Sequence, residues 1–280
     1  MEKETWLITG CSRGIGRGIA EYALQSGKRV VMTARDAESL RELSEAYPEQ
    51  ALALALDVTQ DAMIEEAVRT AEKKFGGIDV LVNNAGYAYR VALEEGEWSE
   101  IERIYATNLF GPLKLMRAVL PGMRAARRGA VVKISSISAV QGAVGSGYYA
   151  SAKAAIEQLS VCLRREAAPL GIKVMIVEPG PFRTGFQQAL TDGAVKIADY
   201  AETAWKTRRE NLVLTHDEAG DPKRAGKIIV DTIERPDYPE RLVLGKMAVE
   251  FIRDRLRERL DEIAAWQEVS AAADYPAHEA

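Results

Sequence analysis

The sequence predicts an α/β fold in which one doubly wound parallel sheet is flanked by helices on both faces. Short β-branched and apolar runs alternate along the chain with longer amphipathic segments, which is the order of a parallel sheet with right-handed crossovers. Several of the short runs are apolar nearly throughout, as strands are when helices cover both faces of their sheet. The chain has 280 residues, a length at which an α/β unit commonly forms one domain.

The expected strands are short runs, each followed by a loop. In chain order they are Trp6–Thr9, Arg29–Thr33, Ala51–Leu56, Asp79–Val82, Ala130–Ser135 and Lys173–Val177. Ala51–Leu56 is the least distinctive, because alternating Ala and Leu also suit a helix. A last strand, Arg241–Leu244, follows a break at Pro236 and Pro239 and ends at Gly245.

Helices are expected between these strands. The first begins near Gly14, carries Ile15, Ile19 and Ala23 at spacings of four, and ends at Gly27. Others are expected at about Ala62–Phe75, Trp98–Arg127 and Tyr148–Ala168.

The end of the chain differs from this pattern. Residues 183–226 mix polar and apolar side chains without a strong period. After Gly245 a charged segment carries one helical apolar stripe, so a C-terminal helical extension is expected. The stripe consists of Met247, Phe251, Ile252, Leu256, Leu260 and Ile263.

Composition and charge exclude several classes of protein. The chain has 37 Lys and Arg against 41 Asp and Glu, a balance that gives no basic footprint for nucleic acid. Its two cysteines, Cys11 and Cys162, rule out a disulfide scaffold and fit a cytoplasmic protein. The long uncharged run Ile134–Ala152 is interrupted by Ser and Gly, so we expect no membrane span. His216 and His278 lie far apart without nearby cysteines, so no metal site is expected.

A glycine-rich loop joins the first strand to the first helix. It reads Thr9-Gly10-Cys11-Ser12-Arg13-Gly14-Ile15-Gly16. Glycines permit a tight turn and close approach of a ligand, and the free N–H groups of a helix N-terminus attract a pyrophosphate. A position between strand and helix is the context that dinucleotide binding requires, although a glycine-rich turn can also serve packing alone.

This loop resembles the TGxxxGIG loop of the short-chain dehydrogenase/reductases. Three further motifs follow in the family's order: Asn83-Asn84-Ala85-Gly86, Tyr149-Ala150-Ser151-Ala152-Lys153 and Pro179-Gly180. The resemblance covers roughly residues 4–186 and follows the compact branch of the family. It implies a Rossmann-type fold and hydride transfer between nicotinamide and a carbonyl or secondary alcohol. The C-terminal helix is similar to an extension of bacterial 17β-hydroxysteroid-dehydrogenase-like oxidoreductases, a likeness that does not identify a steroid substrate.

Tyr149 and Lys153 are the candidate catalytic pair. They are four residues apart on an expected helix and therefore share a face. A lysine charge near a phenol lowers its pKa and makes a proton donor or acceptor near neutral pH, although such a pair is also common as a surface contact. The resemblance implies that Tyr149 is the acid and that Lys153 tunes it and binds the nicotinamide ribose. Tyr148 is disfavoured because the residue four positions beyond it is Ala152.

Ser136 lies thirteen residues before Tyr149 and matches the family's serine, which stabilises the substrate oxygen. Ser135 and Ser138 are competitors. On a continuing strand Ser136 and Ser138 would share a face, so Ser138 is open as a second substrate contact. A serine that bonds loop backbone is the alternative for either residue.

The resemblance also assigns a role to Asn108, within the expected helix Trp98–Arg127. In the family this asparagine supports a water and proton relay toward the lysine, here Lys153. The alternative is a polar residue tolerated within a helix.

The residues at the end of the second expected strand indicate which cofactor is bound. Ala34 stands where NAD-preferring relatives usually carry Asp, and Arg35 follows it. Arg13 in the glycine loop is a second guanidinium, and two guanidiniums suit a 2′-phosphate, so NADP(H) is preferred over NAD(H). Asp36 could bond the ribose or cap the next helix.

The resemblance implies further cofactor contacts. Asp57 and Val58 match the adenine-contacting pair, although Asp57 could be a loop cap. Phe182 departs from the usual small aliphatic residue. The full cofactor set, beside Arg13 and Arg35, is Gly10, Ser12, Gly14, Ile15, Gly16, Asp57, Val58, Asn84, Ala85, Gly86, Tyr149, Lys153, Pro179, Gly180, Phe182 and Thr184.

The substrate site carries no motif. We expect residues 1–245 to form the catalytic domain, with 185–226 as its substrate loop or lid, and residues 246–280 to form a helix and tail packed on the same domain. Apolar and aromatic candidates favour a hydrophobic ketone or alcohol, unless most of them pack the loops. They are Phe186, Leu190, Tyr200, Trp205, Tyr87, Tyr89, Val140 and Val144.

Two other classes of function stay open at this stage: a non-catalytic regulator that binds a dinucleotide, and an interaction protein that uses the C-terminal helix. The retained tyrosine and lysine disfavour the first, and the intact glycine loop disfavours the second. In relatives the helices corresponding to Trp98–Arg127 and Tyr148–Ala168 pair about a two-fold axis, so a homodimer or homotetramer is expected. The apolar residues expected to support it are Leu109, Leu113, Met116, Leu120, Ile156, Leu159 and Leu163.

Overall fold

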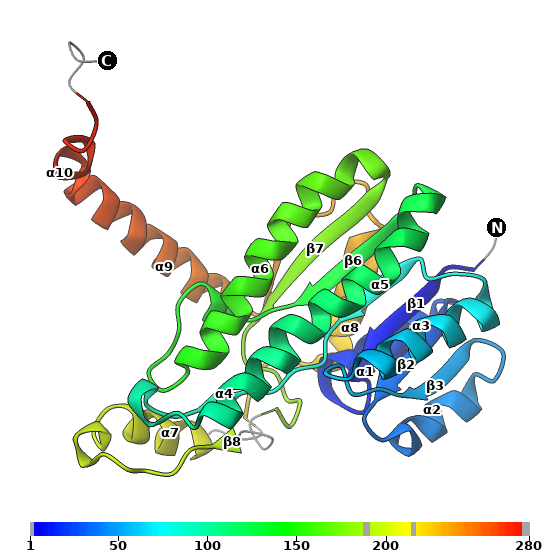
Figure 1. Ribbon diagram of the computed structural model, residues 1–280, viewed down its shortest axis with the longest axis horizontal. Coiled ribbons are helices and arrows are strands. Elements are labelled where there is room, and N and C mark those ends of the chain that lie inside the picture. Colours follow the sequence, from blue (N-terminus) through cyan, green and yellow to red (C-terminus); the bar gives the residue numbers. More distant parts are fainter. Residues whose placement is uncertain (1–2, 187–190, 214–216, 276–280) are drawn as a thin grey trace.

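A parallel sheet runs through the molecule, with seven strands in the order β3-β2-β1-β4-β6-β7-β9 (Figure 1). The computed structural model describes residues 3–186, 191–213 and 217–275. The strands are β1 Thr5–Thr9, β2 Arg29–Ala34, β3 Ala51–Ala55, β4 Val80–Asn83, β6 Gly129–Ile134, β7 Ile172–Pro179 and β9 Arg241–Leu244. The doubly wound parallel sheet predicted from the sequence is confirmed. Even the ambiguous run at Ala51 is a strand, because it pairs in parallel with β2 from Val30 onward.

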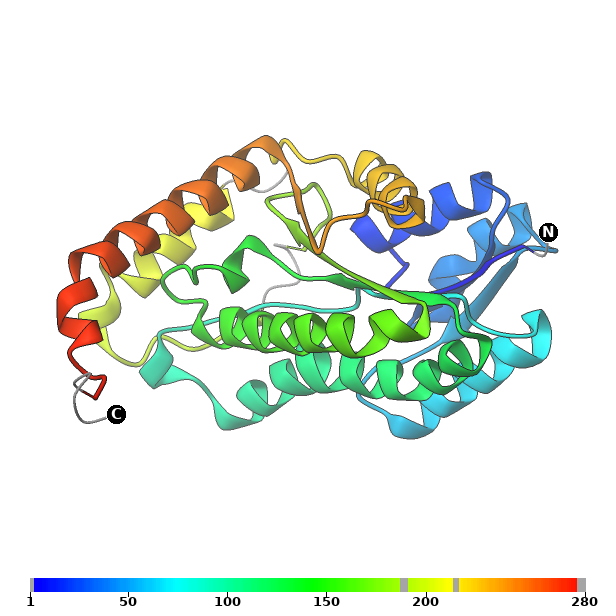
Figure 2. The ribbon, with the colours of Figure 1, turned by 90° about the horizontal axis from the view of Figure 1, so that it is seen from above.

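Helices cover the two faces of the sheet (Figure 2). One face carries α1 Gly14–Gln25, α2 Arg41–Ala46 and α8 Pro222–Glu234, and its core includes Trp6, Ile19, Met32 and Ile229. The other carries α3 Asp61–Phe75, α5 Gly111–Ala126 and α6 Gly147–Ala167, with Leu7, Leu81, Leu115 and Ile156 in the core. Each apolar strand therefore contributes side chains to the cores on both faces of the sheet, which explains why apolar and polar residues do not alternate along it.

Helix α8 lies in a part of the chain where the sequence showed little periodicity before residue 226. Its start has a local signal, because Asp221 accepts a hydrogen bond from the Lys223 N–H at 2.8 Å and Pro222 follows at the first helical position. The helix packs closely on α1. A Cβ added to Gly18 would lie 2.2 Å from the Pro222 carbonyl oxygen, so glycine permits the close approach.

The segment predicted as one helix over Trp98–Arg127 is interrupted. It consists of α4 Trp98–Tyr105, the π-helical turn η3 Ala106–Phe110 and α5 Gly111–Ala126. The predicted helical stretch is confirmed, but its centre is a π turn rather than regular α-helix. An inserted π turn leaves little trace in apolar periodicity, and such turns are frequent at functional sites.

Shorter elements close one end of the sheet. They are η2 Leu93–Glu95, η4 Ile137–Ala139, η7 Ala198–Tyr200, α7 Ala204–Val213 and the two-stranded pair β5 Tyr89–Arg90 with β8 Thr191–Asp192. The turns η1 Ala37–Leu40 and η5 Ala168–Leu170 lie elsewhere. Within the described ranges, no helix is long and apolar enough to cross a membrane.

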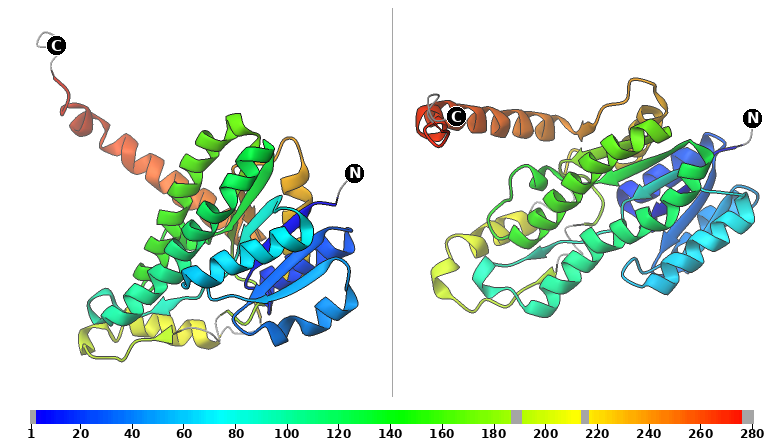
Figure 3. Two further views of the ribbon diagram at one scale, coloured as in Figure 1. Left: turned by 45° about the vertical axis from the view of Figure 1, so that its right-hand side comes forward. Right: turned by 45° about the horizontal axis from the view of Figure 1, so that its top comes forward.

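The C-terminal helices α9 Lys246–Ala265 and α10 Gln267–Ala271 extend away from the sheet (Figure 3). The beginning of α9 contacts β9 and η4, and Ile252 is buried. Further along, Leu260 is 64% exposed. The apolar stripe is thus confirmed as helical, and the division of the chain at residue 245 stays a prediction.

Candidate active site

The loops after β1 and β4 are held together by a dense set of hydrogen bonds. Thr9 Oγ1 accepts hydrogen bonds from the N–H groups of Asn84 at 3.0 Å and Ala85 at 2.9 Å. Asn84 Nδ2 donates to the carbonyls of Thr9 at 2.7 Å and Gly10 at 3.0 Å. A Cβ on Gly16 would lie 2.3 Å from Asn84 Nδ2, so the two motifs fit only with glycine at that position.

The glycine loop has the geometry of an anion cradle. Gly10 and Gly14 have φ of +73° and +63°, a region that favours glycine. Arg13 is the N-cap residue of α1, and its side chain makes no capping hydrogen bond. The first-turn N–H groups therefore lack a side-chain cap and suit a phosphate. Thr184 closes on this loop, since a Cβ on Gly14 would lie 2.8 Å from the Thr184 Cβ.

Two arginines flank the cradle. Arg13 and Arg35 are exposed, and within the described part of the chain neither makes an ion pair or a side-chain hydrogen bond. Asp36 Oδ1 accepts a hydrogen bond from the Glu38 N–H at 3.0 Å, so this carboxylate caps η1. Asp57 likewise accepts from the Thr59 N–H at 2.9 Å, as a loop cap does. The open cradle and the two uncommitted guanidiniums suit the phosphates of a dinucleotide.

Tyr149, Lys153 and Ser136 meet beside β6. Tyr149 is 8% exposed and Lys153 is 3% exposed. Lys153 Nζ lies 5.7 Å from the centroid of the Tyr149 ring and donates a hydrogen bond to the Ile134 carbonyl at 3.0 Å. The Ser136 side chain lies near enough to Tyr149 to oppose the rise in its pKa, and the Ser136 Oγ accepts a hydrogen bond from the Ser138 N–H at 3.1 Å.

Burial dominates the protonation of this pair. It raises the pKa of Tyr149 to about 12, against the opposing effects of the Ser136 hydrogen bond and the Arg90 charge. Burial also lowers the pKa of Lys153 to about 8, against the charge of Glu157. The sequence argument that the lysine charge lowers the phenol pKa is therefore incomplete, because it omits the low-dielectric surroundings of both groups.

Asn108 lies in the π turn η3 and is fully buried. Its Nδ2 donates to the Tyr87 carbonyl at 2.8 Å, and its Oδ1 accepts from the Tyr87 N–H at 3.2 Å. A Cβ on Gly86 would lie 2.7 Å from that oxygen. The π turn thus brings Asn108 against the loop after β4, within the region that also holds Lys153.

The argument that placed Ser138 on a continuing strand was wrong. Strand β6 ends at Ile134, and the chain turns into η4 with Ser136 as its N-cap residue. Ser135 is buried. Ser136 therefore bonds a loop backbone and also meets the tyrosine, which unites the two roles that the sequence left as alternatives.

A cluster of buried charges lies behind Lys153, and sequence reasoning missed it. Glu178 on β7 and Glu157 on α6 are buried, and Arg241 Nε lies 3.4 Å from Glu178 Oε1 and 3.8 Å from Glu157 Oε2. Burial raises the pKa of Glu178 to about 7, and the charge of Glu157 acts in the same direction. Lys133 is fully buried, and burial lowers its pKa well below the ordinary value. A lysine within an apolar strand was the available signal.

The substrate candidates are only partly brought together. Phe186 lies beside Tyr149, with ring centroids 5.9 Å apart, and belongs to an aromatic cluster with Trp205, Tyr87 and Tyr89. Tyr200 packs against the same cluster but donates its hydroxyl to Glu94 Oε2 at 2.6 Å. Of the remaining candidates, Val144 is exposed, Val140 is half-buried, and Leu190 lies outside the described residues.

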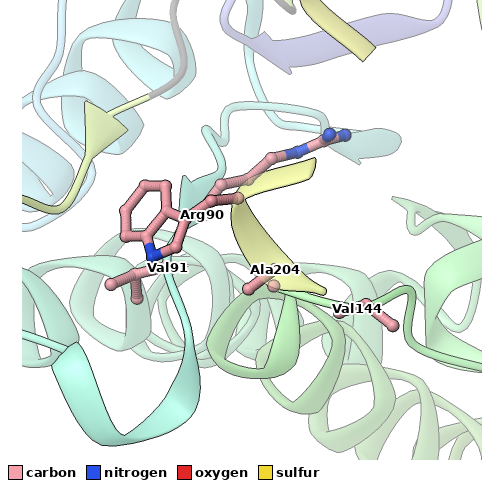
Figure 4. A pocket seen from close by; sticks show the side chains of 6 residues that line it. Arg90, Val91, Val144 and Ala204 are labelled. Carbon is pink, nitrogen blue, oxygen red and sulfur yellow. The ribbon is translucent and has the colours of Figure 1, made fainter. Parts of the chain in front are cut away.

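A small cavity, with no room for a water molecule in this conformation, borders this cluster (Figure 4). It is lined by Arg90, Val91, Val144, Gly145, Ala204 and Trp205. The sequence analysis had named Val144 and Trp205 but not Arg90. A charged residue beside aromatic positions was visible in the sequence, yet nothing local indicated that the fold would bring it into the region of Tyr149.

The remaining cofactor candidates lie around the same end of the sheet. Ile15 and Val58 are buried, whereas Ser12 and Gly86 are exposed. Pro179 ends β7, the Gly180 N–H donates to the Leu244 carbonyl at 3.0 Å, and Phe182 packs against the α1 side of the core.

The doubly wound fold, with a glycine loop after its first strand, is that of a dinucleotide-dependent oxidoreductase. The chain belongs to the short-chain dehydrogenases, since the family model described as short chain dehydrogenase matches residues 4–194.

Similar proteins agree with this class over nearly the whole chain. An oxidoreductase named BOA17 from Botryotinia fuckeliana is 34% identical and covers 96% of this chain and 98% of its own. A 3-ketodihydrosphingosine reductase from Bacteroides thetaiotaomicron is 33% identical over 88% of this chain and 90% of its own. The crystal structure of a short-chain dehydrogenase from Streptomyces avermitilis matches with a TM-score of 0.91 and 40% identity, covering 98% of this chain and all of that one.

Family members bind NAD or NADP. A Burkholderia phymatum member solved with NAD has a TM-score of 0.82 at 18% identity, covering 94% of this chain and 95% of its own. An alcohol dehydrogenase from Thermococcus sibiricus solved with 5-hydroxy-NADP has a TM-score of 0.72 at 24% identity, covering 87% and 96%. At these identities the likeness concerns the fold.

Proposed function

We propose that the protein is an NADP(H)-dependent oxidoreductase that interconverts a hydrophobic ketone and its secondary alcohol. The observation that carries this proposal is the meeting of Tyr149, Ser136 and Lys153, all buried, beside a glycine loop built to hold a phosphate. A ketone substrate is supported by the aromatic cluster around Tyr149 and by the 3-ketodihydrosphingosine reductase among the similar proteins.

In the proposed reduction, the side chains divide the work. The bound nicotinamide supplies the hydride. Tyr149 gives its proton to the forming alkoxide, and the Ser136 hydroxyl donates a hydrogen bond to the same oxygen. Lys153 holds the nicotinamide ribose and orients the proton path, while Asn108 fixes the backbone at Tyr87 and supports a relay toward Lys153. Burial of the pair keeps bulk water from the reacting oxygen.

The preference for NADP(H) rests on the two guanidiniums at the end of β2 and in the glycine loop. Arg35 follows the β2 residue Ala34, and Arg13 begins α1. The Asp36 carboxylate caps η1, so it is not placed to bind the ribose hydroxyls of NAD(H) in the way that an acid after the second strand does. The glycine loop at the start of α1 would hold the pyrophosphate of the cofactor, and Arg13 and Arg35 would bind its 2′-phosphate.

The assembly proposed is a homodimer, or a tetramer built from it. Leu159 on α6 is 40% exposed and Phe110 in η3 is 49% exposed, so this face offers apolar surface. Met116 and Ile156, which the sequence analysis counted toward the interface, are instead buried in the chain's own core. Light scattering at micromolar concentration checks this proposal, and a stable species of one chain's mass would contradict it. A cytoplasmic location is part of the proposal, supported by the free cysteines Cys11 and Cys162.

The experiment that tests the function is nicotinamide absorbance at saturating NADPH with a panel of ketones. Turnover of at least one hydrophobic ketone, with NADPH better than NADH, is the expected result. Binding of NADPH without turnover of any ketone or alcohol in the panel would instead favour the non-catalytic regulator.

A further inference from the structure

Arg90 is a charged residue within an otherwise apolar and aromatic part of the site. It lies on β5, whose partner strand β8 places Asp192 opposite it. Arg90 lines the small cavity together with Val91, Val144 and Ala204, and Figure 4 shows its side chain extended, with the guanidinium directed away from the labelled apolar side chains.

The guanidinium of Arg90 is not committed to the protein. Among the described residues this guanidinium makes no hydrogen bond and no ion pair. Other half-buried arginines have partners: Arg164 donates to the Val174 carbonyl at 2.6 Å, and Arg17 pairs with Glu21 at 2.7 Å. A guanidinium has five N–H donors, and leaving them unpaired away from water costs free energy, so an uncommitted one beside a cavity suits a ligand.

The position of this charge relates it to the reaction centre. Arg90 and Tyr149 influence each other electrostatically, and the Arg90 charge favours the ionised form of the Tyr149 phenol. Strand β5 packs against α6, and Tyr89 and Val91, which flank Arg90, belong to the same buried cluster as Tyr149, so the two groups lie in one region of the fold. Asp192 also acts on Arg90, but its carboxylate is exposed at the surface. The Arg90 charge therefore lies in the region of the fold that holds Tyr149.

We propose that Arg90 binds a carboxylate on the substrate, so that the protein acts on hydrophobic oxo acids and their hydroxy acids. This inference rests on the proposed function and names the substrate class of the same site. A planar guanidinium binds a carboxylate through two parallel hydrogen bonds, which fixes both distance and orientation. With the carboxylate held there, the ketone carbon lies toward Tyr149 and Ser136, and the apolar part of the chain packs along Val91, Val144 and Trp205.

The chemistry balances without any further co-reactant. Hydride from the reduced nicotinamide forms a C–H bond at the ketone carbon while the C=O π electrons move to oxygen. The Tyr149 proton then forms the O–H bond. The carboxylate keeps its charge and its bonds throughout, so Arg90 acts by positioning and contributes to specificity rather than to proton transfer.

Matched pairs of substrates test the proposal. Each pair contains one oxo acid and its primary amide, with the same chain length and the same ketone position. Wild type should favour the acid by about 10- to 100-fold in kcat/KM, the usual worth of a charged hydrogen-bonded pair. Arg90→Leu should remove that preference by lowering kcat/KM for the acid, with the amide changed by less than about 3-fold. Arg90→Lys should keep part of the preference, since it retains charge but not the two-pronged geometry.

Two controls separate this role from others. Arg209→Leu removes an exposed cation from α7, at the same end of the molecule, and should leave the preference unchanged. The amide reports any general effect of the Arg90 charge on Tyr149, because the amide needs the same proton transfer. Calorimetric titration of the hydroxy acid onto the NADP⁺-bound protein supplies a readout that needs no turnover, and Arg90→Leu should weaken it by the same factor.

Failure of the carboxylate site and failure of the proposed oxidoreductase function give different results. Turnover of ketones with no preference for the acid, or an equal loss for acid and amide in Arg90→Leu, would overturn the carboxylate site and leave the oxidoreductase function intact. Absence of turnover for every ketone would contradict the proposed function. The titration would then decide the carboxylate site by itself, with equal affinity in wild type and Arg90→Leu counting against it. Should Arg90→Leu fail to fold, Arg90→Lys and the wild-type preference decide the question.

Discussion

The cofactor side and the substrate side of the site are built in different ways. On the cofactor side, the loops after β1 and β4 are joined by hydrogen bonds to backbone atoms, with glycine at the points of closest approach. On the substrate side, β5, β8 and α7 meet through an aromatic cluster, and Val195 remains 58% exposed. The first region needs particular residues, because specific side chains bond backbone atoms there and glycine is required at the close approaches. The second region is held by apolar packing, which tolerates substitution, so its residues can vary with the substrate.

This difference yields graded expectations for variants. Changes on the cofactor side should affect chemistry or cofactor choice for every substrate. Changes on the substrate side should be smaller and should depend on the ketone used.

The largest effect is expected for Tyr149→Phe. The ring still fills its space beside Phe186, but the proton donor is lost, so kcat should fall by roughly 10²- to 10⁴-fold with every ketone. NADPH binding, measured by fluorescence titration, should change little.

Tyr148→Phe is the matched control. Its hydroxyl donates to the Leu93 carbonyl at 2.6 Å, away from the proton path, so this variant should stay active. If Tyr149→Phe kept more than half of the wild-type activity, the assignment of the acid would be wrong.

The next effect concerns cofactor choice. Arg35→Asp removes a cation from the proposed 2′-phosphate site and adds a repelling charge, so NADPH affinity should fall by roughly 10- to 100-fold while NADH loses little. Arg13→Ala should act in the same direction but less, because it adds no repulsion. The measurement is the ratio of kcat/KM for the two cofactors, and an unchanged ratio in Arg35→Asp would place the phosphate elsewhere.

A third prediction concerns the buried charges behind Lys153. The pKa of Glu178 is raised to about 7 in the folded protein, above its ordinary value near 4.5, so folding favours the protonated carboxyl. The stability of the folded protein that depends on a protonated Glu178 is fully present below about pH 4.5 and is lost as the pH rises through 7. Glu178→Gln mimics the protonated form, so its stability relative to wild type should improve between pH 5 and pH 8 by on the order of 1–3 kcal/mol.

Urea unfolding at several pH values checks this expectation. Asp237→Asn is the control, because the Asp237 carboxylate lies on the surface and pairs with Arg235, which lowers its pKa. A pH dependence for Glu178→Gln equal to that of wild type would mean that the cluster is ionised in the folded state throughout this range.

The same contrast explains what could be predicted from the sequence. The strands and the motif residues were predictable, because apolar runs and glycine positions are local signals. Asn108 was found through the resemblance, but its π turn was not, since one extra residue in a helix hardly changes the apolar pattern. The structure shows the π turn together with the hydrogen bond from Asn108 to the Tyr87 carbonyl.

Residues brought together by tertiary structure were missed for a related reason. Glu157, Glu178 and Arg241 come from three separate elements, and no one of them is unusual in its own segment. Arg90 and Tyr149 are separated in the chain by the helices α4 and α5, the strand β6 and several turns. Their proximity follows from the order of strands in the sheet and from the pairing of β5 with β8, which involves runs too short to recognise.

The smallest expected effect belongs to Phe186→Ala, on the substrate side. The Phe186 ring lies tilted against Tyr149 at 5.9 Å between centroids, a contact worth about 0.5–1.5 kcal/mol beyond area burial. Loss of this wall should lower kcat/KM by roughly 2- to 10-fold for bulky ketones, chiefly through KM, and less for small ones. Phe251→Ala changes a residue of α9, far along the chain from the aromatic cluster. This variant should leave kcat/KM unchanged for bulky and for small ketones. Steady-state kinetics with a bulky and a small ketone separate the outcomes. An equal fall in kcat for both would mean that Phe186 orients Tyr149 itself, so that the substrate side shares in the chemistry and the contrast between the two regions is less sharp than the structure indicates.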